Sequence, residues 1–222
     1  MSGEHEGHDH EHDGHEHAGI VEQTELTWAA RRFRAIEALL EEKGICSWQD
    51  ITDVVQETEA RSPADGARVV ARAWTDPEFK QRLLANPEEA ITSIGIALPE
   101  NGARIEVFEN TEDAHHVVVC TLCSCYPRTL LGRPPDWYKS LNYRSRAVVD
   151  PRGVVREFGL EIPNDVRVEV HDSTADLRYL ILPKRPEGTE GWSEEALAAL
   201  VTRDSMIGVT EARSPDAVAS AG

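Results

Sequence analysis

The chain has 222 residues, 40% of them hydrophobic, which is enough for one or two domains with a true interior. A formal charge of −17 argues against nucleic acid or anionic membrane partners, because both are recognised by a basic face. Since the sequence has no membrane-spanning apolar run, no apolar signal segment and only four cysteines, we expect a cytoplasmic protein without a disulfide framework.

Residues 1–20 form a histidine-rich tail that cannot bury apolar area and is predicted to be disordered. Imidazoles that alternate with carboxylates favour loose binding of divalent cobalt, nickel or zinc. Two interpretations stay open: a solvated tail with incidental metal affinity, or a segment that captures metal for a site elsewhere. The histidines are His5, His8, His10, His12, His15 and His17.

Residues 21–100 show helical periodicity. Gly44 ends the first helix and Ser47 can cap the second. Prolines just inside the start of a helix predict three more. These helices are short and thinly apolar for a free-standing core, so the segment is expected to pack on something else. The dipeptides that open the last three are Ser62-Pro63, Asp76-Pro77 and Asn86-Pro87.

Residues 101–210 mix strand and helix signals and predict an α+β domain. Alternation predicts a strand around 105–107, and the run 117–119 a buried one. Strands at 166–170 and 177–182 could pair with each other, and the stretch 134–159 is largely helical. Ser193 can cap a final helix that runs to about Arg203. Residues 211–222 are expected to form a flexible tail.

Three of the four cysteines lie within the six residues Cys120-Thr121-Leu122-Cys123-Ser124-Cys125, here called the cysteine loop. Thiolates select transition metals, and Cys123-x-Cys125 is too close for an ordinary zinc knuckle. Sulfur and amide nitrogens of Cys123, Ser124 and Cys125 can instead close five- and six-membered chelate rings in one plane, with Cys120 sulfur axial. A trivalent ion can deprotonate the two amides, leaving about −2 net charge that needs cationic neighbours. Zinc, iron–sulfur and disulfide readings remain alternatives.

The run 117–127 resembles the metal-binding signature of the nitrile hydratase α-subunit and of the related thiocyanate hydrolase γ-subunit. The likeness covers residues 21–210, with matching segments at 134–140, 143–146, 150–153, 185–193 and 203–209. It implies a layered α-β-β-α domain and an extended arm over 21–100 that wraps a β-type partner subunit. It further implies partner arginines at the metal site and a cobalt-loading activator.

The resemblance also implies chemistry. The loop would hold one Co(III) per chain, with Cys123 as sulfinate, Cys125 as sulfenate and Cys120 unmodified. In this family a threonine at position 121 favours cobalt over Fe(III), as does Tyr126. The expected reaction is hydration of a carbon–nitrogen triple bond, with the oxygenated Cys125 sulfur as nucleophile or base.

Further site residues are expected by resemblance. Asp172, Asp176 and Arg178 match an acidic-acidic-basic set that supports the metal site, although Asp176 stands where glutamate is usual. A polar turn is the alternative. His115 and His116 are expected to make structural hydrogen bonds rather than to bind the loop's metal.

Arg128 stands where nitrile hydratases usually carry tryptophan and thiocyanate hydrolase γ-subunits carry arginine. A guanidinium beside the metal favours an anionic substrate, whereas a structural salt bridge is the alternative. The resemblance therefore predicts a cobalt nitrile hydratase, with thiocyanate hydrolase second. A metal-storage or metallochaperone protein, with the tail as its working part, and a zinc-stabilised interaction module are more distant readings.

Overall fold

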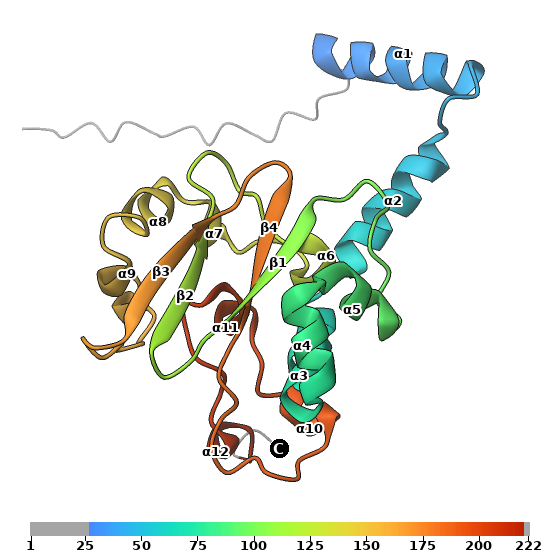
Figure 1. The fold of residues 1–222 in the computed structure, drawn as a ribbon. Coiled ribbons are helices and arrows are strands. Elements are labelled where there is room, and N and C mark those ends of the chain that lie inside the picture. The colour runs from blue at the N-terminus through green and yellow to red at the C-terminus, as the bar shows by residue number, and fades with distance from the viewer. Residues whose placement is uncertain (1–26, 220–222) are drawn as a thin grey trace, which may run out of the picture. The chain divides into compact units, whose positions relative to one another are not determined.

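The structure, a computed structural model, describes residues 27–219 (Figure 1). The histidine-rich tail predicted over 1–20 lies outside these residues, so its metal binding stays a prediction. The chain divides at Thr52 and Asp53 into two compact units. None of the helices between 27 and 219 is long and apolar enough to cross a membrane.

The first helices begin and end where the sequence predicts. Helix α1 (Trp28–Glu42) ends just before Gly44, whose φ of +62° is a conformation that glycine adopts readily. Helix α2 (Trp48–Ala60) is capped by Ser47, whose hydroxyl accepts a hydrogen bond from Asp50 N at 3.2 Å. No residue of α1 or α2 is buried, and Trp28 and Phe33 are 66% and 56% exposed.

Helices α3 (Ala64–Thr75), α4 (Pro77–Ala85) and α5 (Pro87–Ser93) belong to the second compact unit. They bury apolar side chains such as Val70, Phe79 and Ile91 in its core. These short helices therefore find their core against the strands that follow, and the arm over 21–100 that wraps a partner subunit stays a prediction. Proline opens α4 and α5 as predicted, and Asp76 caps α4 by accepting from Phe79 N at 2.9 Å.

Within residues 27–219, four strands form two separate parallel pairs. Strands β1 (Arg104–Glu109) and β4 (Leu177–Leu182) pair, as do β2 (Ala114–Val119) and β3 (Arg167–Asp172). The predicted pairing of the third strand with the fourth is wrong. All six residues of β2 are buried, so this strand needs cover on both faces, and β3 pairs with it rather than folding back on β4.

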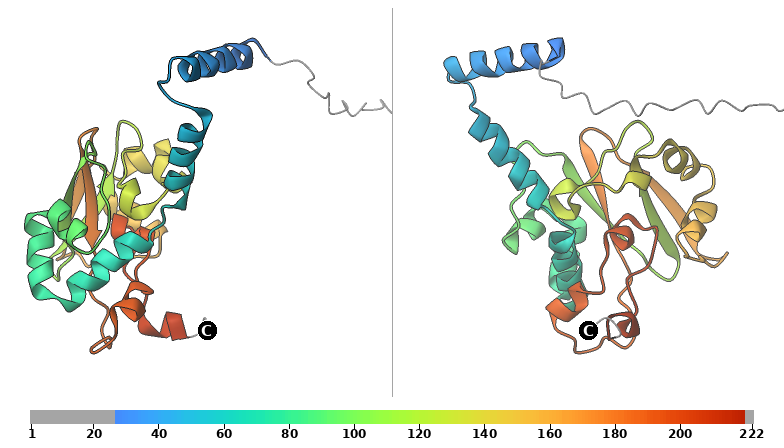
Figure 2. Two further views of the ribbon diagram at one scale, coloured as in Figure 1. Left: turned by 90° about the vertical axis from the view of Figure 1, so that its right-hand side faces the viewer. Right: turned by 180° about the vertical axis from the view of Figure 1, so that it is seen from behind.

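Helices lie on both sides of the paired strands (Figures 1 and 2). Helices α4 and α5 contact β1, α11 contacts β4, and α9 contacts β3. The fold is thus mixed α/β with two small parallel sheets. The remaining helices are α6 (Arg128–Leu131), α7 (Asp136–Lys139), α8 (Leu141–Arg146), α9 (Pro151–Glu157), α10 (Glu194–Ala198), α11 (Arg203–Ile207) and α12 (Pro215–Ala219).

The single helix predicted to run to about Arg203 is two separate helices in the structure. Ser193 caps α10 as expected, with its hydroxyl accepting from Ala196 N at 3.2 Å, but that helix stops at Ala198 rather than near Arg203. Thr202 caps a separate helix, α11, with the reciprocal hydrogen bonds of a capping box. Beyond it, Arg213 N donates to Leu200 O at 2.8 Å and the short helix α12 follows, while the flexibility expected of residues 211–222 stays a prediction.

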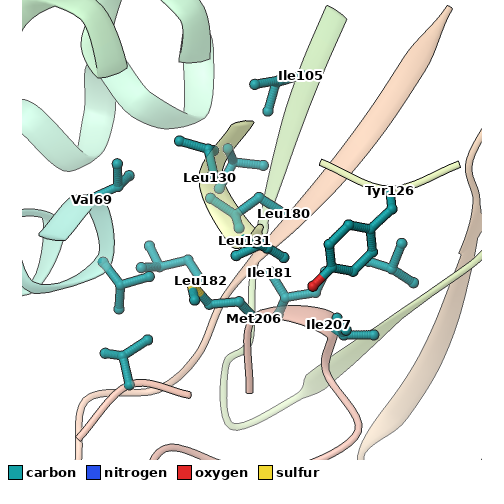
Figure 3. Close-up of a cluster of buried hydrophobic side chains, with 14 of the residues drawn as sticks. Val69, Ile105, Tyr126, Leu130, Leu131, Leu180, Ile181, Leu182, Met206 and Ile207 are labelled. Atoms are coloured by element: carbon teal, nitrogen blue, oxygen red, sulfur yellow. The ribbon is translucent and has the colours of Figure 1, made fainter. Parts of the chain in front are cut away.

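The main core lies among β1, β4 and helices α3, α6 and α11 (Figure 3). Leu130, Leu131 and Met206 are fully buried there beside Leu180 of β4. Tyr126 joins the same cluster with 3% of its surface exposed. The residues that directly follow the cysteine loop are therefore fixed in the core.

Candidate metal centre

The cysteine loop is anchored at both ends by buried residues. Strand β2 delivers Cys120 at its end with 1% of its surface exposed, and Tyr126 returns the chain to the core. Between them Cys123 is exposed and Cys125 is half-buried. The loop can thus present its sulfurs on one side while its ends stay fixed.

The three sulfurs converge. Cys120 Sγ lies 3.4 Å from Cys123 Sγ, and Cys123 Sγ lies 3.2 Å from Cys125 Sγ. All three ligand atoms lie within 4.8 Å of one another. With metal–sulfur bonds of about 2.3 Å, two sulfurs would be about 3.3 Å apart at a right angle and about 3.8 Å apart at a tetrahedral angle. The spacing therefore fits adjacent corners of an octahedral site better than a tetrahedral zinc knuckle.

The thiols differ in how readily they ionise. Hydrogen bonds from the thiols of Cys125 and Cys120 lower the pKa of Cys123 to about 7. Burial and the neighbouring Cys123 thiol raise the pKa of Cys125 to about 12. Cys123 therefore reaches the thiolate form, which is the form that binds metals, before Cys125 does. All cysteines of the described chain are free thiols, which disfavours the disulfide reading.

Side chains from α7 and α8 hold the backbone of the loop. Arg144 donates from Nε to Cys120 O at 3.0 Å and from Nη2 to Thr121 O at 2.7 Å. The Tyr138 hydroxyl donates to Cys125 O at 2.8 Å. These two residues hold three of the six loop carbonyls. The sequence gives no sign of this role, because both residues lie well beyond the loop in the chain and only the fold brings them to it.

Asp172, at the end of β3, clamps the first turn of the loop. Its carboxylate accepts from Thr121 N at 2.9 Å and from Thr121 Oγ1 at 2.6 Å. Asp176 lies in the turn before β4, where its carbonyl accepts from Arg104 N at 2.9 Å and its side chain is exposed. The structure thus brings Asp172 to the loop, whereas Asp176 contributes backbone hydrogen bonds to the turn.

A cleft of about 580 Å³ opens beside the second half of the loop. Its lining includes Cys123, Ser124 and Cys125 of the loop. The charged residues that line it are Arg104, Arg128, Arg178, Glu88 and Glu100. The positive charge of Arg178 acts on Cys125 and counters part of the rise in that thiol's pKa. The cationic neighbours that the loop's negative charge requires are therefore partly supplied by this chain.

The chain matches the family described as nitrile hydratase, alpha chain, over residues 27–210. It is 50% identical over 189 residues to the high-molecular weight cobalt-containing nitrile hydratase subunit alpha of Rhodococcus rhodochrous, covering 84% of this chain and 93% of that protein. The chain belongs to the nitrile hydratase alpha-chain family. This confirms the resemblance inferred from the cysteine loop.

The nitrile hydratase alpha-chain family includes thiocyanate hydrolase relatives. The thiocyanate hydrolase subunit gamma of Thiobacillus thioparus is 43% identical over 185 residues, which cover 79% of this chain and 76% of that protein. A solved recombinant thiocyanate hydrolase with partially modified cobalt centres shares the fold with a TM-score of 0.77 and 40% identity. The match covers 85% of this chain and 92% of that one.

Proposed function

We infer that the chain is the metal-binding alpha subunit of a cobalt nitrile hydratase, which hydrates a nitrile to the corresponding amide. The observation that carries this inference is the convergence of three cysteine sulfurs at right-angle spacing in a chain 50% identical to cobalt-containing relatives. The donor set suits a transition ion, and the sulfur spacing suits an octahedral one.

The ion would be held by Cys120, Cys123 and Cys125 through sulfur, and by the amide nitrogens of Ser124 and Cys125. We propose one Co(III) per chain in preference to Fe(III), with Cys123 as sulfinate and Cys125 as sulfenate. When bound, it supplies Lewis acidity toward a nitrile nitrogen or a water molecule. The thiol of Cys123 is the most exposed of the three and ionises more readily than that of Cys125, so it is the first to be available for oxygenation.

The remaining roles fall to residues around the loop. Asp172 would fix Thr121, and with it the loop's first turn, while Arg178 would hold a negatively charged Cys125 sulfur facing the cleft. Asp176 would act by setting the turn that carries Arg178 into β4. The helices on both sides of the paired strands support the layered α-β-β-α arrangement expected for the family.

A β-type partner subunit would complete the site by adding arginines to its charge balance. The exposed apolar side chains of α1 and α2 support a partner-facing role for this segment, since a free surface rarely displays several large ones together. A cobalt-loading activator would act before assembly. The exposed residues in question are Trp28, Phe33, Ile36, Leu39, Trp48 and Val54.

Thiocyanate hydrolysis is the second candidate, and Arg128 is the observation that favours it. Arg128 opens α6 and lines the cleft together with Cys125 and Arg178. An anion entering the cleft would meet these two guanidinium groups beside the cysteine loop, while Arg104, Glu88 and Glu100 line the rest of the cleft. Replacing Arg128 with tryptophan should lower kcat/KM for thiocyanate relative to an aliphatic nitrile by at least tenfold. An unchanged ratio would place Arg128 outside substrate recognition.

The function is tested by co-purifying the chain with its native partner subunits and assaying amide formation from nitriles beside thiocyanate breakdown. Amide formation that depends on bound cobalt is the expected result. A cobalt-loaded complex that turns over neither class of substrate would overturn the proposal. Cys123→Ala in the same complex provides the matched inactive control.

A further inference from the structure

A second group of metal-ligating side chains lies away from the cysteine loop, on one face of the β2–β3 pair. His116 of β2 is the register partner of Glu169 of β3, and His171 follows two residues further along the same face. Fifty-five residues separate the two histidines in the sequence. The group therefore has no local sequence motif, and the parallel pairing of β2 with β3 brings its residues together.

The distances suit a common ligand. His116 Nδ1 lies 2.9 Å from His171 Nε2, close to the spacing of about 3.0 Å for two nitrogens bound at right angles with bonds of about 2.1 Å. Glu169 Oε2 lies 3.8 Å from His116 Nδ1. All three ligand atoms lie within 4.8 Å of one another, so one ion could contact each after small side-chain rotations.

The surroundings orient these ligands. The ring of Phe108 stacks on His171 with centroids 3.8 Å apart, and His116 is 7% exposed. Arg167 Nε contacts the other oxygen of Glu169, Oε1, at 2.5 Å and leaves Oε2 on the side of His116. Outer partners of this kind fix the direction in which metal ligands point.

We propose that His116, Glu169 and His171 bind a divalent first-row transition ion in addition to the ion of the cysteine loop. Two imidazoles and one carboxylate form a donor set that zinc, nickel and cobalt(II) accept, with water completing the coordination. Burial lowers the pKa of both histidines, so both are in the neutral, ligating form at neutral pH.

Such an ion would tie β2 to β3 immediately behind the metal centre. Strand β2 continues into Cys120, and His171 is followed by Asp172, which clamps Thr121. An ion at this point would therefore steady both strands that carry the loop's supports. The sequence favours a hydrogen-bonding role for His116, and without an ion its hydrogen bond with His171 fills that role.

The test uses the full chain in complex with its partner subunits and Zn²⁺ as the probe. After a chelator removes exchangeable metal, zinc binding is titrated for wild type, His171→Gln and Glu169→Gln. Glu161→Gln serves as the control, since its side chain is 73% exposed and pairs with Arg156. All variants keep the same tail histidines, so tail binding cancels in the comparison.

Wild type and the control should bind one more zinc ion per chain than either site variant, or bind it at least tenfold more tightly. Zinc should also raise the melting temperature of wild type by more than that of the variants, because it binds only the folded site. Equal stoichiometry, affinity and melting shift in all four proteins would overturn the proposal. If His171→Gln does not fold, Glu169→Gln decides the outcome. Cobalt retained in the cysteine loop of the variants would show that the two sites are distinct.

Discussion

Replacing Asp172 with alanine should loosen the cysteine loop at its first turn. The carboxylate makes two hydrogen bonds to Thr121, of 2.9 Å to its backbone nitrogen and 2.6 Å to its hydroxyl. A hydrogen bond to a charged group contributes roughly 1.5–3 kcal/mol when buried. Because both residues are partly exposed to water, about 2 kcal/mol for the pair is a fair discounted value.

A loss of about 2 kcal/mol corresponds to about a 30-fold change in an equilibrium constant. We therefore expect Asp172→Ala to retain about 30-fold less cobalt against a competing chelator and to show reduced kcat per chain. Asp172→Asn should fall between, because its amide oxygen can still accept from Thr121 N. That order would show that cobalt retention depends on the hydrogen bonds of the Asp172 carboxylate and not on the size of the side chain.

The assay measures cobalt per chain by elemental analysis after timed dialysis against chelator, beside kcat for a nitrile. Asp176→Ala is the matched control, since Asp176 lies in the turn that follows Asp172 but makes its hydrogen bonds to Arg104 and Thr174 through its backbone. Its cobalt retention should stay within about twofold of wild type. Equal retention and kcat in Asp172→Ala and wild type would refute the clamp.

Three further outcomes are expected. Cys123→Ala should lose both cobalt and activity, because Cys123 sulfur is the neighbour shared by the other two; elemental analysis and turnover check this, and an active variant would refute the site. Burial and the nearby His116 lower the pKa of His171 to about 4, so the folded chain resists protonation that the unfolded chain accepts near 6.5. The contribution of this group to the free energy of unfolding is complete above pH 6.5 and is lost as the pH falls toward 4. Urea midpoints at pH 7 and pH 5 should therefore diverge less for His171→Gln than for wild type. Deleting residues 1–17 should leave cobalt-loaded enzyme active and slow the loading of new enzyme, whereas lost turnover in loaded protein would contradict a capture role.

Local signals predicted the local features of the fold. Pro77, Pro87, Ser47 and Ser193 mark helix starts because each acts on the backbone within a few residues of itself. The cysteine loop was equally readable, since its three ligands lie within six positions. These are cases where sequence neighbours are also spatial neighbours.

Which strands pair with each other could not be predicted from such local signals. The two strands before and after Asp176 have patterns that suit an antiparallel pair, yet each pairs in parallel with a strand much earlier in the chain. The parallel pairing of β3 with β2 goes with the burial of every residue of β2, and burial depends on the whole fold. For the same reason the roles of Arg144 and Tyr138 at the loop carbonyls emerged only from the structure.

The number and kind of atoms bound to the metal decide whether the cysteine loop holds an octahedral cobalt ion. X-ray absorption at the metal edge of the native complex, combined with mass spectrometry of the peptide that contains Cys120–Cys125, gives both. We expect one cobalt per chain, six-coordinate with sulfur and nitrogen ligands, and added oxygen on Cys123 and Cys125. A four-coordinate zinc ion bound to unmodified cysteines would contradict it.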